Sequence, residues 1–369
     1  MNVKQHSRSI VSFFILALTT LLTLSLLVLI IRTRAQKTRS TNRPGELSYK
    51  LASGPYEVES FNQILHDVKR NKDLPVRILA PKSGGQFPVI VFSHGAGGSG
   101  QNYSPLTEHW ASHGYVVIQP THDDSIALRR EKGESLPSGP RELIEEYRFN
   151  YQDWINRVDD IRLVMDSLVD LQKQVPQLRR KIDQRRIGVG GHSYGAFTTQ
   201  MIGGVRLDIP GRPKSQSFAD DRPRAFLLLS PQGKSENELT ESSWGNVSRP
   251  MMSMTGSNDT GMGGLLADWR KDPFTYSPPP DKYFVFIDGA FHMSFTGSLA
   301  EPQIVQGPRR QLISRLAKGT DQKAVFDYVK IAGIAFWDAY LKDDARAKAY
   351  LKSNSLVDYS GKSVTLDRK

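Results

Sequence analysis

The chain has 369 residues, of which 49 are Lys or Arg and 38 are Asp or Glu, and it contains no cysteine. Without cysteine it can form no disulfide, no thiolate metal site and no cysteine nucleophile, and the redox compartment stays open. The formal net charge of +11 could suit a nucleic acid, but several basic residues precede residue 44 and the remainder is only mildly basic. We therefore predict no nucleic-acid partner, since the basic run at 179–186 lacks interleaved aromatic residues and is typical of a solvated helix end.

The N-terminus carries a hydrophobic segment. Residues 1–9 form a basic N-terminus, and residues 10–31 form an uncharged, mainly apolar run. As a helix, this run of about 22 residues is about 33 Å long, enough to cross a bilayer core. We predict a transmembrane anchor at 10–31 and hence a membrane-anchored protein. The alternative is a cleaved signal peptide, which would leave a secreted or periplasmic protein, although signal cores usually have about 7–15 residues. Basic residues on both sides leave the orientation open.

A polar linker is predicted at residues 32–55, and the folded part begins after it. Alternation of apolar and polar residues at 56–61, 64–65 and 74–79 predicts two or three strands, paired antiparallel at the entry to a sheet. The continuous apolar run at 89–92 is typical of a strand buried on both faces. It indicates a parallel sheet that is covered by helices.

That strand runs into the sequence Ser93-His94-Gly95-Ala96-Gly97-Gly98-Ser99-Gly100. A loop this rich in glycine can turn its backbone N–H groups inward without side-chain clashes, which suits a donor to an oxyanion. The N–H of Ala96 is the candidate donor, and a flexible turn is the other interpretation. We interpret His94 as a structural residue that hydrogen-bonds the loop.

Helix and strand patterns alternate over the next part of the chain. A helix is predicted at 103–113, a strand at 115–120, and a longer helix at 153–175, where apolar residues recur at helical spacing. Residues 127–149 are charged and interrupted by glycines and prolines, and we predict that they are irregular. The alternation of strand and helix predicts the α/β class.

A cluster of potential metal ligands follows the second of these strands. His122, Asp123 and Asp124 are adjacent in the sequence. No further ligand appears at a supporting spacing, so we predict a polar loop at the strand end. No metal and no cofactor are predicted for the protein.

Residues 187–196 hold the motif Gly191-His192-Ser193-Tyr194-Gly195 between an apolar run and an unbroken helical segment. A serine on a sharp turn from strand to helix has a strained backbone, so residues without a Cβ are needed two positions before and after it. We interpret Ser193 as a nucleophile and the N–H of Tyr194 as the second oxyanion donor. An ordinary glycine-rich loop would also satisfy the motif, but the flanking strand and helix patterns favour the nucleophile.

The remaining chain continues the same pattern. Three further strands are predicted, at 225–230, 251–255 and 283–287. Irregular segments are predicted at 205–223 and 262–281. A covering helix at 325–341 closes a catalytic domain over 56–350, and a polar C-terminal tail is predicted at 351–369.

Acyl transfer needs a nucleophile, a base, a carboxylate that orients the base, and oxyanion donors. Ser193, Asp259 and His292 each follow a predicted strand, in an order typical of one fold. Asp288 is a rival for the carboxylate, but it lies on the strand that carries His292 and is expected to point elsewhere. Trp244 is either a core aromatic residue or a wall of the acyl pocket.

The four motifs that carry Ala96, Ser193, Asp259 and His292 together resemble the α/β-hydrolase superfamily. Within it, the chain is most similar to dienelactone-hydrolase-like and platelet-activating-factor-acetylhydrolase-like esterases and to bacterial polyester hydrolases, over residues 56–341. The resemblance implies a mostly parallel central sheet with helices on both faces. Dienelactone hydrolases proper use a cysteine nucleophile, which this chain lacks, so their substrate is not transferred.

The resemblance also implies a mechanism. Ser193 would attack the carbonyl of a small-molecule or lipid-like carboxylic ester, His292 would act as general base and then general acid, and Asp259 would hold the imidazole tautomer. The alternatives are a serine peptidase or acyltransferase of the same fold, and a catalytically dead, membrane-tethered binding protein. Neither the oligomeric state nor the acyl length is evident from the sequence.

Overall fold

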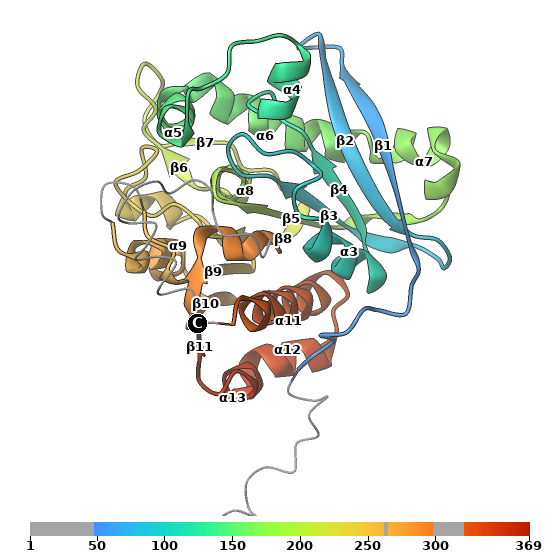
Figure 1. Cartoon of the computed structure of the whole chain (residues 1–369), viewed down its shortest axis with the longest axis vertical. Coiled ribbons are helices and arrows are strands. Elements are labelled where there is room, and N and C mark those ends of the chain that lie inside the picture. The colour runs from blue at the N-terminus through green and yellow to red at the C-terminus, as the bar shows by residue number, and fades with distance from the viewer. Residues whose placement is uncertain (1–47, 262–264, 298–320) are drawn as a thin grey trace, which may run out of the picture. The chain divides into compact units, whose positions relative to one another are not determined.

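The computed structural model describes residues 48–261, 265–297 and 321–369 (Figure 1). The strands are β1 (Val58–Asp67), β2 (Lys72–Pro81), β3 (Phe87–Ser93), β4 (Val116–Pro120), β5 (Ile182–His192), β6 (Arg206–Leu207), β7 (Gln216–Ser217), β8 (Pro223–Leu229), β9 (Met251–Asn258), β10 (Lys282–Phe291) and β11 (Val364–Arg368). The α-helices are α3 (Ser104–Ser112), α4 (Ile126–Glu131), α5 (Pro140–Phe149), α6 (Tyr151–Asp166), α7 (Leu168–Gln174), α8 (Tyr194–Gly203), α9 (Asp272–Tyr276), α11 (Gln322–Leu341), α12 (Ala345–Lys352) and α13 (Ser355–Tyr359). Short 3-10 helices are η1 (Pro176–Leu178), η2 (Glu241–Trp244), η4 (Ala267–Lys271) and η5 (His292–Thr296).

The centre of the structure is a nine-stranded sheet with the order β1-β2-β4-β3-β5-β8-β9-β10-β11. From β4 to β10, neighbouring strands run parallel. At the edges, β1, β2 and β11 pair antiparallel with their neighbours. The predicted α/β class with a mostly parallel sheet is confirmed, and the predicted antiparallel entry consists of the two strands β1 and β2.

Alternate residues of the central strands pack on opposite faces of the sheet. In β3, Val89 and Val91 belong to one apolar cluster, while Ile90 and Phe92 belong to another. All four residues are at most 1% exposed. Because both faces are covered, every position of the strand can be apolar, which explains the continuous apolar run in the sequence.

Helices cover both faces of the sheet (Figure 1). On one side α6, α7 and α8 contribute apolar residues to the first cluster, including Val158 and Phe197. On the other side α3 and α11 contribute to the second cluster, and Trp110 of α3 meets Trp337 of α11 edge to face, with ring centroids 5.9 Å apart. The strands between these layers are therefore shielded from solvent, and polar groups concentrate where the strands end.

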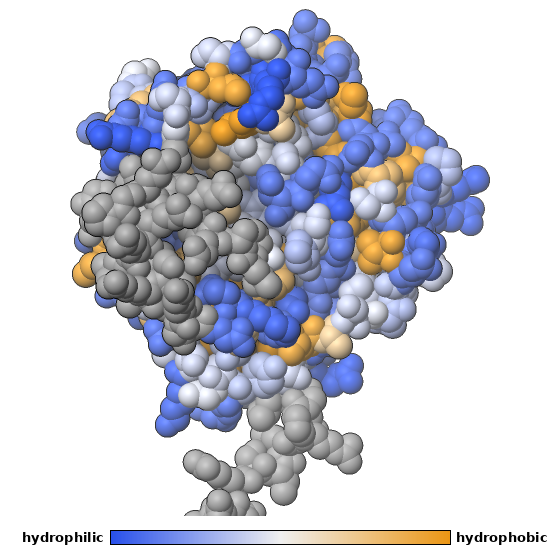
Figure 2. Space-filling view, in the orientation of Figure 1, coloured by the Kyte–Doolittle hydropathy of each residue, from blue (hydrophilic) through white to orange (hydrophobic). Residues whose placement is uncertain are grey.

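The predicted membrane anchor at residues 10–31 lies outside the described residues. Within the described ranges, no helix has both the length and the apolar character that a membrane span requires. The exposed large apolar residues of these ranges are few and scattered, namely Ile64, Val68, Leu136, Phe149, Val169 and Leu266. Figure 2 accordingly shows a mainly hydrophilic face that is interrupted by small apolar patches.

The predicted linker at 32–55 overlaps the described residues from position 48 onward, and that part packs on the domain. The Tyr49 hydroxyl donates to Asp338 of α11 at 3.1 Å. The N–H of Gly54 donates to the hydroxyl of Ser112 in α3 at 2.9 Å. The last residues of this range are therefore a strap across α3 and α11, and not a free linker.

The prediction of a polar C-terminal tail at residues 351–369 is wrong. These residues complete α12, form α13 and supply β11, in which Val364 pairs with Ile287 of β10. Asp344, which suits the end of α11 poorly, instead caps α12 by accepting the N–H groups of Arg346 and Ala347. A five-residue edge strand carries too little alternation to be recognised, because it is stabilised mainly by its pairing partner.

The prediction that residues 127–149 are irregular is wrong. These residues contain most of α4 and all of α5. The glycine and proline that suggest a break in fact start a helix, because Gly139 is the N-cap and Pro140 is the first helical residue of α5. Tyr147 of α5 stacks on Tyr194 directly after the motif serine, with ring centroids 4.5 Å apart. The segment therefore covers the turn on which Ser193 lies.

We expect the replacement Val364→Ala to destabilise the protein by about 2 kcal/mol, because the side chain is fully buried in the second cluster. Thr365→Ala, at the adjacent exposed position of β11, is the matched control and should change the free energy of unfolding by less than about 0.5 kcal/mol. Urea denaturation measures both. Equal stability of the two variants would show that β11 is not part of the folded core.

Candidate active site

The backbone at Ser193 has the strained conformation that the motif predicts. Its φ is +54° and its ψ is −119°, between β5 and α8. A Cβ at Gly191 would collide with the carbonyl of Gly195, and a Cβ at Gly195 would collide with the carbonyl of Ser93. Both glycines are therefore required by backbone contacts, and the turn holds the partly exposed Ser193 at the carboxyl edge of the sheet.

Asp259 and His292 lie at the same edge, because they follow the parallel strands β9 and β10. Nδ1 of His292 is 2.9 Å from Oδ1 of Asp259. No hydrogen bond joins Ser193 to His292 in the part of the chain that the structure describes. Such catalytic hydrogen bonds are often long before substrate binds, so the arrangement is compatible with a nucleophile and its base.

Asp259 is fully buried and is surrounded by donors. Its Oδ2 accepts the hydroxyl of Thr255 at 2.8 Å, and Nε of Arg270 lies 3.1 Å from Oδ1. Burial alone would raise the pKa of Asp259, but the Arg270 charge and the hydrogen bond from His292 outweigh burial and lower the pKa. The carboxylate is therefore ionised. The rival Asp288 instead accepts the hydroxyl of Ser257 at 2.8 Å.

Ser230, which the sequence interpretation missed, also contacts His292. Its Oγ lies 2.8 Å from Nδ1 of His292. Asp259 can only accept, so Nδ1 carries the proton and shares it between Asp259 and Ser230. Ser230 is fully buried, with φ of +53° directly after β8. Its only signal in the sequence is its place at a strand end.

Arg270 is the second residue that was missed. Its guanidinium donates to the carbonyls of Ser230, Pro231 and Asp259 at 3.0, 2.8 and 2.9 Å. The side chain is 5% exposed. Arg270 thereby ties the ends of β8 and β9 together beside the carboxylate.

The two predicted oxyanion donors lie at the ends of β3 and β5. In the described part of the chain, the N–H groups of Ala96 and Tyr194 donate to no protein group. Ala96 is partly exposed, like Ser193. Both amides therefore remain free to bind a substrate oxygen.

A chain of hydrogen bonds links three of the sequence motifs. Gly95 N–H donates to the Tyr103 hydroxyl at 3.0 Å, and this hydroxyl lies 3.0 Å from Nδ1 of His192. Nε2 of His192 lies 2.8 Å from the carbonyl of His292. The carbonyl can only accept, so Nε2 of His192 carries the proton and Nδ1 accepts from Tyr103. His192 of the serine motif thus supports the backbone of His292.

The side chains of the cluster at 122–124 contact other residues of the same chain. Nδ1 of His122 lies 2.8 Å from Asp160, and Nε2 lies 2.9 Å from the hydroxyl of Ser93. These three side chains form a second series of serine, histidine and aspartate, but each residue is at most 1% exposed. The series is therefore structural. Among the described residues, no group of three or more His, Asp or Glu side chains is arranged to hold a metal ion.

Trp244, a candidate for the pocket wall, lies in the core. It is fully buried, and its indole N–H donates to Oε1 of Gln200 at 2.7 Å. Its ring stacks on Tyr276, with centroids 5.9 Å apart. The burial of Trp244 agrees with its interpretation as a core aromatic residue.

Known proteins share parts of this sequence. A family model described as Chlorophyllase matches residues 48–134, which include the loop around Ala96. Over 306 residues the chain is 24% identical to a platelet-activating factor acetylhydrolase of Cavia porcellus, covering 75% of this chain and 62% of that protein. It is 28% identical over 139 residues to chlorophyllase type 0 of Chenopodium album, covering 37% and 35% of the two chains. It is 25% identical over 179 residues to the esterase EstD of Thermotoga maritima, covering 44% and 36%.

These similarities coincide with the strand order and with the serine on its turn from strand to helix. Together they support the assignment of the chain to the α/β-hydrolase superfamily. It spans less than two thirds of the length of the Cavia porcellus relative. In parallel α/β sheets such sites lie at the carboxyl ends of the strands, where loops can vary while the sheet is retained.

We predict that Ser230→Ala slows the modification of Ser193 by a fluorophosphonate about tenfold, corresponding to the loss of one hydrogen bond to a charged group. The variant leaves Nδ1 of His292 with Asp259 as its partner. Ser253→Ala is the matched control, because Ser253 is equally buried in β9 and, among the described residues, its hydroxyl contacts only the Tyr283 carbonyl, at 3.5 Å. An unchanged labelling rate in Ser230→Ala would contradict a role in positioning His292.

The buried histidines predict a loss of stability in mild acid. Burial lowers the pKa of His94 to about 4 and that of His192 to about 3, whereas a histidine in an unfolded chain has a pKa of about 6.5. Between these values the unfolded chain binds more protons, so the free energy of unfolding falls as the pH falls. We expect a slope of up to about 1.4 kcal/mol per pH unit for each histidine between pH 6.5 and 4.5. Urea denaturation at several pH values measures the slope, and constant stability over this range would contradict the neutral tautomers.

Proposed function

We propose that the protein is a serine hydrolase that cleaves carboxylic esters through an acyl-enzyme on Ser193. The observation that carries the proposal is the hydrogen bond between Asp259 and His292 at the strand edge where the strained turn holds Ser193. The relatives support the reaction class, since they include an acetylhydrolase and an esterase by name. The finer likeness to dienelactone-hydrolase-like enzymes, stated from the motifs, belongs to the same proposal.

In the first half of the reaction, Nε2 of His292 takes the proton of Ser193 while Oγ attacks the ester carbonyl carbon. The oxyanion that forms accepts the N–H groups of Ala96 and Tyr194. The bond from the carbonyl carbon to the alcohol oxygen then breaks, and His292 gives its proton to the departing alcohol. Asp259 holds the Nδ1 proton of His292 throughout and stabilises the transient imidazolium.

In the second half, a water molecule attacks the acyl carbon of the ester on Ser193. His292 takes one proton of this water and returns it to Oγ of Ser193 as the carboxylic acid leaves. The residues named supply every proton transfer that the two steps need. The substrate that we propose is a small-molecule or lipid-like ester, and residues 10–31 would hold the enzyme at a membrane where such an ester is found.

A panel of nitrophenyl esters with increasing acyl length tests the proposal on the full chain. We expect hydrolysis of at least one ester, and a loss of at least about 10³-fold in kcat/KM for Ser193→Ala. Asp259→Asn should retain the fold and lose a similar factor, because it favours the wrong tautomer of His292. Equal hydrolysis by the wild type and Ser193→Ala would refute the mechanism, and failure of a fluorophosphonate to modify folded protein would refute the nucleophile.

A further inference from the structure

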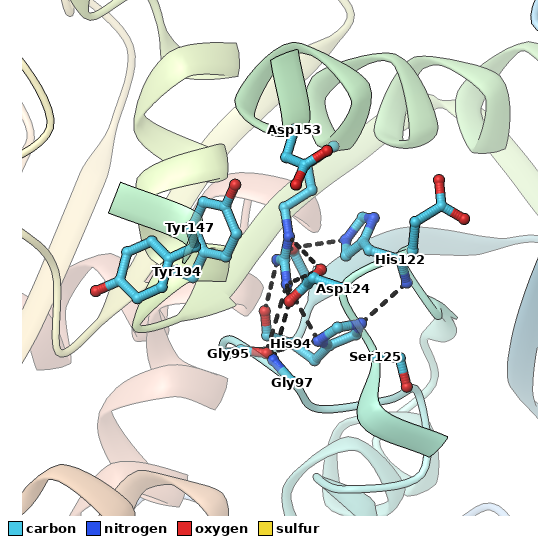
Figure 3. A network of polar contacts seen from close by, with 12 residues as sticks. His94, Gly95, Gly97, His122, Asp124, Ser125, Tyr147, Asp153 and Tyr194 are labelled. Carbon is cyan, nitrogen blue, oxygen red and sulfur yellow. Dashed lines mark hydrogen bonds and ion pairs between the residues drawn. The ribbon is translucent and has the colours of Figure 1, made fainter. Parts of the chain in front are cut away.

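A buried arginine lies beneath the loop of residues 94–98, which we call the glycine loop. Nη1 of Arg157 donates to the carbonyl of His94 at 2.8 Å, and Nη2 lies 3.5 Å from the carbonyl of Gly95. Arg157 comes from α6 and its side chain is 2% exposed. Figure 3 shows that His94, Gly95 and Asp124 lie close together in one network of polar contacts.

The carbonyl of Gly95 is also held by two hydrogen bonds from within the loop. Nδ1 of His94 donates to it at 2.7 Å, and Gly98 N–H donates to it at 3.1 Å. In a trans peptide the C=O and the following N–H point in opposite directions. Donors that hold the Gly95 carbonyl therefore turn the Ala96 N–H to the other side, away from Arg157.

The neighbouring amides of the loop are each taken by a protein acceptor. Gly95 N–H donates to the Tyr103 hydroxyl, and Gly97 N–H donates to Oδ2 of Asp124 at 2.9 Å. Gly98 N–H donates to the Gly95 carbonyl. Among the described contacts of residues 95–98, Ala96 is thus the one whose N–H has no protein acceptor. The loop conformation leaves a single free donor.

Asp124 and Arg157 form one unit. Nε and Nη2 of Arg157 donate to the two carboxylate oxygens of Asp124 at 3.0 and 2.8 Å. The guanidinium also lies 4.0 Å from the ring centroid of Tyr194, and this ring stacks on Tyr147. Arg157 therefore contacts both segments that carry the free N–H groups, namely the glycine loop and Tyr194. Its charge is neutralised by Asp124 in the ion pair.

The His94 ring admits one protonation state in this arrangement. Its Nδ1 must donate to the Gly95 carbonyl, and its Nε2 must accept the N–H of His122 at 3.0 Å. A neutral ring satisfies both bonds, whereas a protonated ring would lose the second. Burial and the adjacent Arg157 charge lower the pKa of His94 to about 4, which keeps this ring neutral.

We propose that Arg157, paired with Asp124, is a positioning residue of the oxyanion hole, which fixes the Gly95–Ala96 peptide so that the Ala96 N–H faces the acyl oxygen. The proposal rests on the proposed ester hydrolysis for its kinetic consequence. Its structural content is independent of that activity, because it states which way one peptide group points.

Arg157→Lys tests the proposal, since a lysine keeps the charge but cannot hold Asp124 and the loop carbonyls together. We expect kcat for a nitrophenyl ester to fall about 10- to 100-fold, with KM changed less than about threefold, because oxyanion donors act in the transition state. Arg77→Lys is the matched control. Arg77 is 8% exposed and binds Ser60 and Glu108 at the sheet edge, and its variant should keep wild-type kcat.

A folded Arg157→Lys enzyme with kcat within about twofold of the wild type would overturn the proposal. If this variant does not fold, as judged by circular dichroism, Asp124→Asn provides the same kinetic test. A crystal structure of the folded variant gives the second readout, in which the Gly95–Ala96 peptide should be rotated or disordered. If the wild type hydrolyses no ester, the proposed function fails, while an unchanged peptide in the variant would still refute the positioning role.

Discussion

The hydrogen bond between His292 and Asp259 joins the ends of two neighbouring parallel strands, and the geometry of the site depends on their register. Ile287 of β10 pairs with Gly256 of β9, but Phe291 pairs with Asn258, so β10 has extra residues in between. This bulge includes Gly289, with φ of +78°. The extra residues of the bulge place His292 opposite Asp259 at the end of the neighbouring strand. The side-chain pair is therefore set by the backbone pairing of the sheet.

The same edge of the sheet buries several charges, and each has a partner. Asp259 lies against Arg270, and Asp124 is held by Arg157. An unpaired charge in these places would cost several kcal/mol. Pairing offsets the free-energy cost of burying these charges. In addition, each arginine donates to backbone carbonyls at the ends of the strands. The loops that carry the site are consequently held by groups with fixed geometry, which is the condition for a preorganised oxyanion site.

Three buried histidines act as neutral connectors in this framework. His94 holds the glycine loop, His192 links Tyr103 to the backbone of His292, and His122 joins Ser93 to Asp160. In the His94 ring Nδ1 donates to a carbonyl and Nε2 accepts a backbone N–H, which only the neutral form permits. Burial lowers the pKa of all three. The imidazole of His292, by contrast, is 38% exposed and reaches the surface of the domain.

The sequence by itself determined the features whose causes are local. The glycines around Ser193, the buried strands and the polar residues that follow them are specified by adjacent residues, because backbone strain, side-chain period and turn chemistry act over a few positions. The structure then showed that Asp259, and not Asp288, contacts His292.

Only the tertiary structure decided which distant residues support these groups. Arg157 is 63 positions from His94 in the chain, and Ser230 is 62 positions from His292. The helix α5 and the edge strand β11 likewise escaped recognition, because what stabilises them is packing on Tyr194 and pairing with β10. Such contacts arise from the order of strands in the sheet and from the helices laid across it. No short pattern of residues encodes that order, since it results from burying both faces of one sheet at once.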